Sequence, residues 1–372
     1  MTVKRILIVG GGIAGLSLDL ALRGGPWEVD LAERGPGDGG LGAGLAVQPN
    51  AMRVLRELGV ADAVAKAGAV IRRFQYRDRS GTLLCDIDLG DLWGDVGPFV
   101  GITRTGLHAA LRADPDRHRT GMPVTSVRQN NGGISACFGD GTAATYDLVV
   151  GADGINSDVR RSAVDPSAPA YGGQMVWRSV ARVPHAALDA VQFWLGSDRF
   201  FGLCPAGDGI TYGFGNIGCP RMRDPVGGRK RRLAGLFADF GAPVRDFLAA
   251  VETDGAIHCA PVEWLPGVAW GTGHVILIGD AAHAMSPMMG QGGCMAIEDA
   301  LVLADELRRG EDIPGALTAF VRRRGSRVDW VRGQSQALGD LVRLPAAVRD
   351  AALADRGVTA FFDRYRPLTT AP

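Results

Sequence analysis

Three glycines and one acidic residue near the start of the chain have the types and spacing that bind a dinucleotide. Gly10, Gly12 and Gly15 follow an apolar run at 6–9, and Glu33 closes the next apolar segment. Gly10 permits a tight turn, Gly12 lets the backbone approach a pyrophosphate, and Gly15 lets a helix pack closely on a strand. The start of that helix supplies unpaired N–H groups, and Glu33 would accept hydrogen bonds from an adenosine ribose. An ordinary strand-to-helix turn would explain the glycines but not the position of the acid.

A second acidic residue, Asp280, follows a fully apolar run at 275–278. Such runs are typical of strands buried in parallel sheets, and open α/β sheets bind ligands at the carboxyl ends of their strands. Asp280 is therefore a candidate for binding a ligand hydroxyl, with a helix N-cap worth about 1 kcal/mol as a plainer and compatible role. Further on, Gly290, Gln291 and Gly292 precede an apolar helix whose positive end would stabilise negative charge. A flexible loop is the alternative there.

The elements that must position these residues alternate between helical and extended patterns. Residues 49–59 predict a helix that begins at a proline and ends at a glycine. A Ser-Gly turn at 80–81 predicts a hairpin, and a second hairpin is expected to pair 134–138 with 146–150. Aromatic and β-branched side chains are frequent in 171–217, which predicts a largely antiparallel sheet.

The nucleotide-binding pattern returns late in the chain, after that second sheet, so a discontinuous domain is expected. The predicted fold class is α/β, with a Rossmann-like domain, an interleaved and mainly antiparallel sheet domain, and C-terminal helices. The expected boundaries are 1–71, 98–170 and 268–330 for the first domain, 72–97 and 171–267 for the second, and 331–372 for the helical segment.

Composition excludes several classes of function. Lysine plus arginine and aspartate plus glutamate balance at 40 each, so electrostatics give no reason to expect nucleic acid or an anionic membrane as the main partner. Six cysteines without C-x-x-C spacing and six dispersed histidines predict reduced thiols and no metal. The first strand begins almost at Met1 and no apolar stretch is long enough to span a bilayer, which predicts a cytoplasmic protein.

Three segments that lie far apart in the sequence carry one arrangement. They are the glycine-rich start with Glu33, the middle segment Gly151-Ala152-Asp153-Gly154, and the late segment 279–292, which begins Gly-Asp-Ala-Ala-His. Together they resemble the single-component FAD-dependent aromatic hydroxylases of the p-hydroxybenzoate and salicylate hydroxylase family. The resemblance spans about residues 3–305, and it implies that the Rossmann-like domain binds FAD.

The resemblance also implies roles for individual residues. Arg104 would approach the FAD phosphates, Val124 the adenine, Asp280 the ribityl chain, and Asp153 both FAD and the nicotinamide nucleotide. Taken alone, Arg104 is equally well explained as a surface arginine and Asp153 as a turn residue. The full set of expected cofactor-binding residues is Gly10, Gly12, Ile13, Ala14, Gly15, Glu33, Arg34, Arg104, Val124, Asp153, Asp280, Pro287, Gly290, Gln291 and Gly292.

The reaction implied by the resemblance is hydroxylation of an aromatic ring. NADH or NADPH, which the sequence does not distinguish, would reduce the flavin, and dioxygen would form a flavin C4a-hydroperoxide. This chemistry needs a pocket that excludes water, which the second sheet should supply. The expected partners are thus a small aromatic substrate and dioxygen, and the protein is expected to be a monomer or a homodimer.

Candidate substrate contacts lie on the expected antiparallel sheet. Arg178 could hold a substrate carboxylate or phenolate and Tyr212 could hydrogen-bond a phenol, so these two are the candidate catalytic residues. A surface ion pair is an equally plausible role for Arg178, and ordinary core packing is an equally plausible role for Tyr212. Other candidate substrate residues are Trp177, Phe201, Cys204, Phe214 and Met288.

Met288 marks a departure within the family. Urate hydroxylases of the family carry an aspartate directly after the proline, where this chain has Met288. Two adjacent methionines suggest an adaptable apolar face, which favours a phenolic or polycyclic aromatic over a polar purine. Three other functions remain open at this stage: a lipid reductase that needs no oxygen, a halogenase, whose W-x-W-x-I-P motif is missing at 177–180, and a flavin-binding protein without activity.

Overall fold

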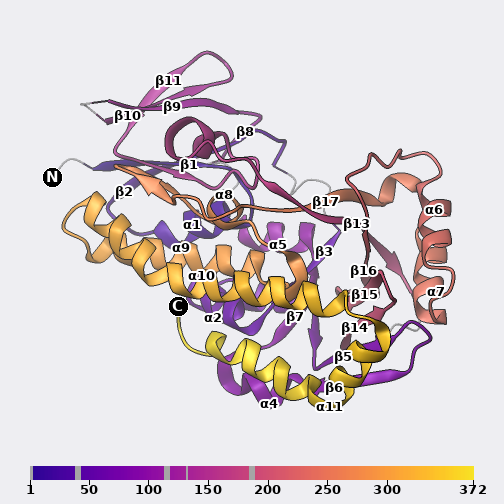
Figure 1. Cartoon of the computed structure of the whole chain (residues 1–372). Helices are drawn as coiled ribbons and strands as arrows, with labels where there is room; N and C mark the ends of the chain where they lie inside the picture. The colour runs from indigo at the N-terminus through magenta and orange to yellow at the C-terminus, as the bar shows by residue number, and fades with distance from the viewer. Residues whose placement is uncertain (1–2, 38–42, 113–117, 131–132, 184–188) are drawn as a thin grey trace.

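We describe the protein from a computed structural model, which covers residues 3–37, 43–112, 118–130, 133–183 and 189–372. A six-stranded sheet contains Glu33, and the glycine-rich turn and Asp280 each follow one of its strands (Figure 1). All of its strands run parallel except β18 at one edge. Its order is β18 (Gly271–Thr272), β19 (Val275–Leu277), β12 (Leu148–Gly151), β1 (Lys4–Val9), β2 (Trp27–Glu33) and β8 (His118–Thr120). The predicted return of the late apolar run to the nucleotide-binding sheet is therefore confirmed.

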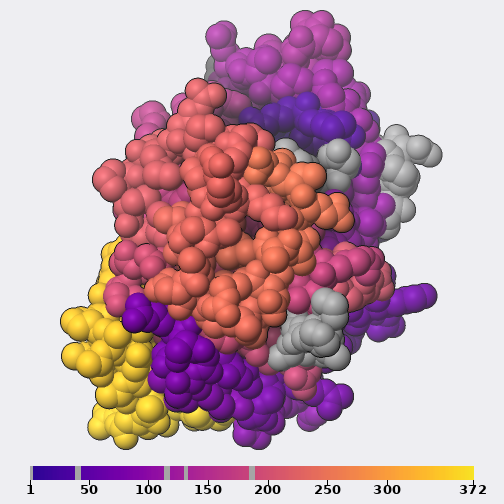
Figure 2. All heavy atoms as spheres, turned by 90° about the vertical axis from the view of Figure 1, so that its right-hand side faces the viewer, coloured from indigo at the N-terminus to yellow at the C-terminus, as the bar shows by residue number. Residues whose placement is uncertain are grey.

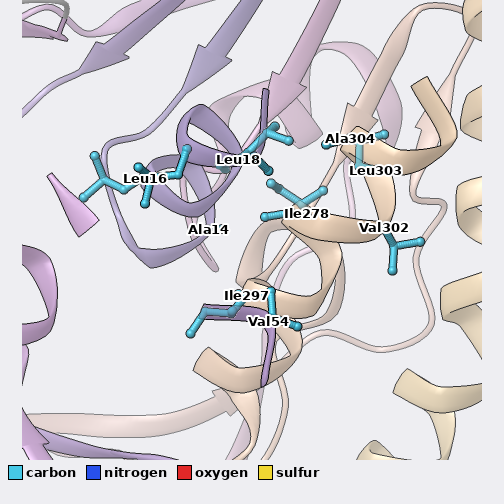
Figure 3. Packing of buried hydrophobic residues seen from close by; sticks show 14 of the residues in the cluster. Ala14, Leu16, Leu18, Val54, Ile278, Ile297, Val302, Leu303 and Ala304 are labelled. Carbon is cyan, nitrogen blue, oxygen red and sulfur yellow. The ribbon is translucent and has the colours of Figure 1, made fainter. Parts of the chain in front are cut away.

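Helices cover this sheet because their apolar faces need a partner. The helix α1 (Ile13–Leu22) is buried along almost its whole length and packs against α9 (Gly292–Arg309). Figure 3 shows Leu18 of α1 close to Ile278, which follows β19. Beside them lie α2 (Pro49–Glu57), α3 (Ala61–Ala67) and α5 (Arg104–Leu111). The predicted helix from Pro49 is confirmed, and Gly59 after it has a φ of +76°.

A seven-stranded sheet forms the second layer of the molecule. Its order is β17 (His258–Trp264), β13 (Ala170–Arg182), β16 (Ile210–Gly218), β15 (Arg199–Pro205), β14 (Ala190–Leu195), β5 (Arg73–Asp78) and β6 (Leu83–Asp88). Neighbouring strands are antiparallel apart from the parallel pair β14 and β5. The mainly antiparallel sheet and the hairpin at 80–81 are confirmed. The domain boundaries stay a prediction, although the strands of this sheet come from the two segments assigned to the second domain.

Two smaller antiparallel sheets complete the strands. One contains β11 (Ala143–Tyr146), β10 (Gly133–Phe138) and β9 (Val124–Asn130), and the other β3 (Gly44–Val47), β7 (Phe99–Thr103) and β4 (Ala69–Ile71). The hairpin expected to pair 134–138 with 146–150 is wrong in part. Its returning strand ends at Tyr146, and residues 148–151 instead join the parallel sheet beside β1. Side chains on β12 are buried completely, which a half-exposed hairpin would not allow.

The two faces of the seven-stranded sheet are covered by different helices. On one face lie α6 (Arg229–Leu236) and α7 (Ala242–Ala250). On the other lie α4 (Leu89–Trp93), α10 (Ile313–Val342) and α11 (Ala346–Tyr365), so the helices expected near the C-terminus are confirmed. Figure 2 shows the side of the molecule on which the orange-red residues of the second sheet and α6–α7 lie beside the yellow α11. No described helix is both long and apolar enough to cross a membrane.

Candidate active site

The glycine-rich turn after β1 brings three backbone segments too close together for a side chain. Gly10 has a φ of +110°, and a Cβ there would lie 2.4 Å from the carbonyl oxygen of Ala152. A Cβ on Gly15 would lie 1.9 Å from the carbonyl oxygen of Gly10. Both obstacles are backbone atoms, which cannot rotate away as a side chain can. The two glycines therefore fix the distance between α1, β1 and β12.

Gly12 has a different role because the space above it is open. A Cβ at this position would meet no described heavy atom within 4 Å. Gly12 is also the N-cap of α1, where no side chain of the described residues caps the helix and no acidic residue lies in the first turn. The first N–H groups of α1 thus point into open space at the positive end of the helix. This arrangement fits the phosphate groups of a dinucleotide.

Glu33, the last residue of β2, is held beside this turn by two backbone groups. Its Oε2 accepts a hydrogen bond from the Gly11 N–H at 2.7 Å, and its Oε1 accepts one from the Gly35 N–H at 2.6 Å. Each carboxylate oxygen keeps a further lone pair for a second donor. The carboxylate is therefore fixed in position and still able to accept hydrogen bonds from a ribose.

A cavity of about 470 Å³ lies in front of the turn and collects most of the expected cofactor residues. The expected residues that line it are Gly10, Gly12, Glu33, Arg34, Arg104, Val124, Asp153 and Asp280. They come from the turn after β1, the end of β2 and the residue after it, α5, β9, the segment after β12 and the start of α8 (Asp280–His283). The expected residues absent from its lining are Ile13, Ala14, Gly15, Pro287, Gly290, Gln291 and Gly292. The first three lie within α1, Pro287 begins a short helix before α9, and the last three lead into α9.

His108 lines the same cavity and was missed by the sequence analysis. It lies on α5, one turn after Arg104, and its Nε2 is 3.0 Å from the carbonyl oxygen of Gly11. Because a carbonyl can only accept, this ring nitrogen donates and holds the glycine-rich turn against α5. The sequence does carry a signal for His108: it lies four residues after Arg104, and this spacing places both residues on one side of a helix.

The two aspartates of the cavity differ in their surroundings. Asp153 is well buried, which raises the pKa of its carboxyl, although hydrogen bonds from Ser157 and the Val159 N–H oppose this shift. Its Oδ2 also accepts the Asp158 N–H at 2.7 Å, so Asp153 has the turn role that was its alternative, and it lines the cavity as well. Asp280 is exposed at the cavity and follows Gly279, whose φ is +58°.

Gln291 does not present its side chain to the cavity, so a contact with the cofactor would have to come from its backbone. The residue is 1% exposed, and its amide nitrogen donates to Gln48 at 2.8 Å and to Asn50 at 3.1 Å. The Asn50 amide donates back to the Gln291 Oε1 at 3.0 Å. Gln291 therefore ties the short helix η5 (Pro287–Met289) and the start of α9 to α2, and only its backbone remains available to a ligand.

Five of the expected catalytic and substrate residues gather on one face of the seven-stranded sheet. Arg178 on β13 is paired with Phe214 on β16, and Cys204 on β15 is paired with Tyr212. Met288 joins the same buried cluster from η5. Burial raises the pKa of Tyr212, an effect that the nearby Arg178 guanidinium partly opposes. The Tyr212 phenol is thus protonated at neutral pH and available as a hydrogen-bond donor.

Trp177 and Phe201 lie on the opposite face, so the structure does not bring them together with Arg178 and Tyr212. The Trp177 indole donates to Asp224 at 2.8 Å, and the Phe201 ring centroid lies 5.0 Å from that of Phe237 beyond α6. Successive residues of a strand point to opposite faces, so Trp177 cannot share a wall with Arg178. The aromatic rings that do share the Phe214 face, and that were missed, are those of Phe74, Phe193 and Phe200.

Behind the cavity, Asp299 of α9 accepts hydrogen bonds from three donors. Its Oδ2 lies 2.6 Å from His283 Nε2 and 2.9 Å from the Gly279 N–H, and its Oδ1 lies 2.8 Å from Arg324 Nε. Burial by itself raises the pKa of Asp299, but His283 and Arg324 outweigh burial and lower the pKa to about 2. Asp299 therefore stays ionised in the folded protein at pH values that protonate an ordinary aspartate.

This shift predicts a pH dependence of stability. The folded-state pKa lies below the unfolded value, so the contribution of Asp299 is present above about pH 4 and is lost as the pH falls toward about 2. The unfolding free energies of the wild type and Asp299→Asn, measured by urea titration, should therefore converge by about 2 kcal/mol over that range. A difference that stays constant between about pH 5 and pH 2 would contradict the assignment.

Among the described residues, no group of three or more histidine, cysteine, aspartate or glutamate side chains could hold a metal ion. All six cysteines are free thiols. Burial raises the pKa of Cys204 and that of Cys294 to about 12, so neither is a thiolate at neutral pH.

Comparison with known proteins agrees with this geometry. A family model described as an FAD binding domain matches residues 4–214 and 257–327. The aurachin C monooxygenase/isomerase of Stigmatella aurantiaca is 34% identical over 333 residues, which cover 88% of this chain and 87% of that protein. A 3-amino-4-hydroxybenzoate 2-monooxygenase of Streptomyces platensis is 32% identical over 370 residues, which cover 95% of this chain and 92% of that protein. The structure of Klebsiella pneumoniae HpxO complexed with FAD and uric acid has a TM-score of 0.90 at 25% identity, covering 98% of this chain and 97% of that one.

Proposed function

The chain belongs to the FAD binding domain family and is an FAD-dependent monooxygenase of aromatic compounds, and we propose that its substrate is an apolar phenolic or polycyclic aromatic. Its relatives favour neither the reductase, the halogenase nor the inactive flavoprotein. The substrate proposal rests on one observation, the composition of the sheet face that carries Arg178. Tyr212, Phe214, Cys204 and Met288 share that face and are buried or nearly so.

The apolar part of this face supports a hydrophobic ring system as substrate. The Phe214 ring centroid lies 5.1 Å from that of Tyr212 and 5.4 Å from that of Phe193. Met288 is 4% exposed in the same cluster, where urate hydroxylases of the family carry an aspartate. A purine would leave its many polar edges without partners against these side chains, whereas an apolar aromatic would not.

The polar end of the face supports one oxygen-bearing substituent on that ring. Arg178 would stabilise a phenolate or carboxylate of the substrate, and the protonated Tyr212 would donate a hydrogen bond to it. Holding a phenolate makes the ring electron-rich and therefore easier to hydroxylate. The surrounding phenylalanines and Met288 would exclude water from the reacting ring.

Bound FAD would supply the redox chemistry by which NADH or NADPH activates dioxygen, and dioxygen is the proposed second substrate and the source of the transferred oxygen atom. We assign the phosphates of FAD to the open space above Gly12, and the adenosine ribose of FAD to Glu33. Arg104 lines the same cavity and would add positive charge near the phosphates. Asp280 would hold the ribityl hydroxyls, and the start of α9 at Gly290–Gly292 would bring a positive helix end toward the flavin ring.

The ribose assignment predicts that Glu33→Gln weakens FAD binding about tenfold. A glutamine offers one acceptor oxygen where the carboxylate satisfies both the Gly11 and Gly35 N–H groups, and a hydrogen bond to a charged group contributes about 1.5–3 kcal/mol. Titration of the apoprotein with FAD, followed by flavin fluorescence, measures the change. Glu28→Gln on the exposed part of the same strand is the control and should bind as the wild type. Equal affinities for all three proteins would contradict the role of Glu33.

The substrate proposal is tested by oxidation of NAD(P)H in the presence of candidate aromatics. The FAD-loaded enzyme should oxidise NADH or NADPH faster with hydroxylated bicyclic aromatics and apolar phenols than with urate. Mass spectrometry under ¹⁸O₂ should find one labelled oxygen in the product. Rapid turnover of urate, with no response to any phenol, would refute the proposed substrate class.

A further inference from the structure

Arg324 of α10 is completely buried, although it carries a charge and does not line the cavity. Its guanidinium joins two carboxylates that are neighbours on α9. Nε donates to Asp299 Oδ1 at 2.8 Å, and Nη1 donates to Glu298 Oε2 at 2.6 Å. All three side chains have an exposed fraction of 0%. A buried ion pair needs such complete pairing because desolvation of each charge is costly.

The first carboxylate connects Arg324 to the turn that carries Asp280. The other oxygen of Asp299 accepts the Gly279 N–H at 2.9 Å and lies 2.6 Å from His283 Nε2. Gly279 and His283 flank Asp280 on either side, and Gly279 has the left-handed φ of +58°. The direction of the Asp280 side chain therefore depends on a backbone that Asp299 holds at both ends of α8.

The second carboxylate connects Arg324 to the segment before α9. Glu298 Oε1 accepts from the Asn50 amide at 2.8 Å, and Asn50 is paired with Gln291. Gln291 donates to Gln48, whose own amide donates to the carbonyl oxygen of Met289 at 2.7 Å. This chain of buried amides ends on the backbone directly before Gly290.

We infer that Arg324 is a positioning residue that holds two segments in one arrangement: the Asp280 turn, which lines the cavity, and the Met289–Gln291 segment, which leads to the proposed flavin contact; the inference therefore rests on the FAD placement proposed above. A planar guanidinium can donate to two carboxylates at once in a fixed geometry, which the ammonium group of lysine cannot reproduce. Without Arg324, Asp299 would keep only His283 and the Gly279 N–H, and Glu298 would keep only Asn50 and Arg327, so no group would link the two carboxylates. The inference concerns FAD alone and holds whichever aromatic is the substrate.

The test is Arg324→Lys, which keeps the positive charge but removes the planar guanidinium that donates to both carboxylates. The apoprotein should keep its far-ultraviolet circular dichroism, and its dissociation constant for FAD should rise about tenfold or more, since a hydrogen bond to a charged group is lost. The bound flavin should also change its visible absorption maxima and midpoint potential, because its protein surroundings move. Arg322→Lys is the matched control: this arginine is exposed on the same helix and should leave all three readouts unchanged.

Wild-type FAD affinity, absorption and potential in a folded Arg324→Lys protein would overturn the inference. If the Arg324→Lys protein fails to fold, the second variant to test combines Arg324→Met with Glu298→Gln and Asp299→Asn, so that these three charges are removed together. Weakened FAD binding and a shifted flavin spectrum in that protein would support the positioning role. Normal flavin properties, or failure of this variant to fold as well, would reduce Arg324 to a structural residue and refute the inference.

Discussion

Gly15→Ala is expected to give a protein that neither folds stably nor retains FAD. The added Cβ would lie 1.9 Å from the carbonyl oxygen of Gly10, a contact that the backbone of the glycine-rich turn must relieve by moving. Movement of α1 away from β1 would also open the packing of α1 against α9. Overpacking of a core typically costs about 1–3 kcal/mol, and a clash between two backbone segments lies at or above the top of that range. Thermal unfolding and flavin content of the purified protein measure both effects.

Gly12→Ala is expected to weaken FAD binding without lowering the stability of the fold. Its Cβ meets no described atom, so the apoprotein should unfold at the wild-type temperature, yet the methyl group would stand where the phosphates are proposed to approach. FAD affinity should therefore fall while stability remains. Gly333→Ala on α10 is a suitable control, because nothing lies near its Cβ and alanine favours a helix by about 1 kcal/mol. Normal FAD binding by both Gly12→Ala and Gly15→Ala would refute the proposed phosphate site.

Arg178→Met is expected to lower kcat/KM for a phenolic substrate about 100-fold, with FAD binding unchanged. The methionine keeps much of the length of the side chain but removes the charge that would stabilise the phenolate, and an unpaired charge in a buried site costs about 3 kcal/mol. Steady-state oxidation of NAD(P)H, together with quantification of the hydroxylated product, measures this loss. NAD(P)H oxidation that continues without product would indicate that the substrate is bound in the wrong orientation.

Two further variants test the proposed contacts of Arg178 and Tyr212 with the substrate. Tyr212→Phe should lower kcat/KM less than Arg178→Met, because a neutral hydrogen bond contributes about 1 kcal/mol. Arg182→Met is the control, since Arg182 lies four residues along the same strand but is exposed and donates to the carbonyl of Asp208. If Arg178→Met and Arg182→Met had the same small effect, Arg178 would be an ordinary surface arginine.

Local patterns predicted the parts of the site that are local in sequence. The spacing of Gly10, Gly12 and Gly15 is set by one turn and one helix, so the close approach of Gly15 to Gly10 follows from local sequence, whereas the approach of Gly10 to Ala152 depends on a distant segment. Glu33 ends one strand and Asp280 lies shortly after another, and the parallel sheet brings both to one cavity. The family resemblance added Arg104 and Val124, which line that cavity but have no signal of their own.

Contacts between distant segments could not be predicted in the same way. Trp177 and Arg178 are neighbours in sequence, and only the register of β13 with β16 determines which of them faces Met288. Gln291 follows a glycine as a cofactor contact would, yet its partners Gln48 and Asn50 lie more than 240 residues away. A polar side chain gives no sign in the sequence of whether another amide or a ligand satisfies it.

The position of β19 beside β12 also bears on how the holoenzyme is made. Residues 275–277 pair with 149–151, and Asp280 comes only after them, so three quarters of the polypeptide must leave the ribosome before the cavity has all its walls. Cofactor loading is therefore a late event in biogenesis. Nascent chains that end before about residue 280 should bind no FAD and should expose the apolar edge of β12 to chaperones.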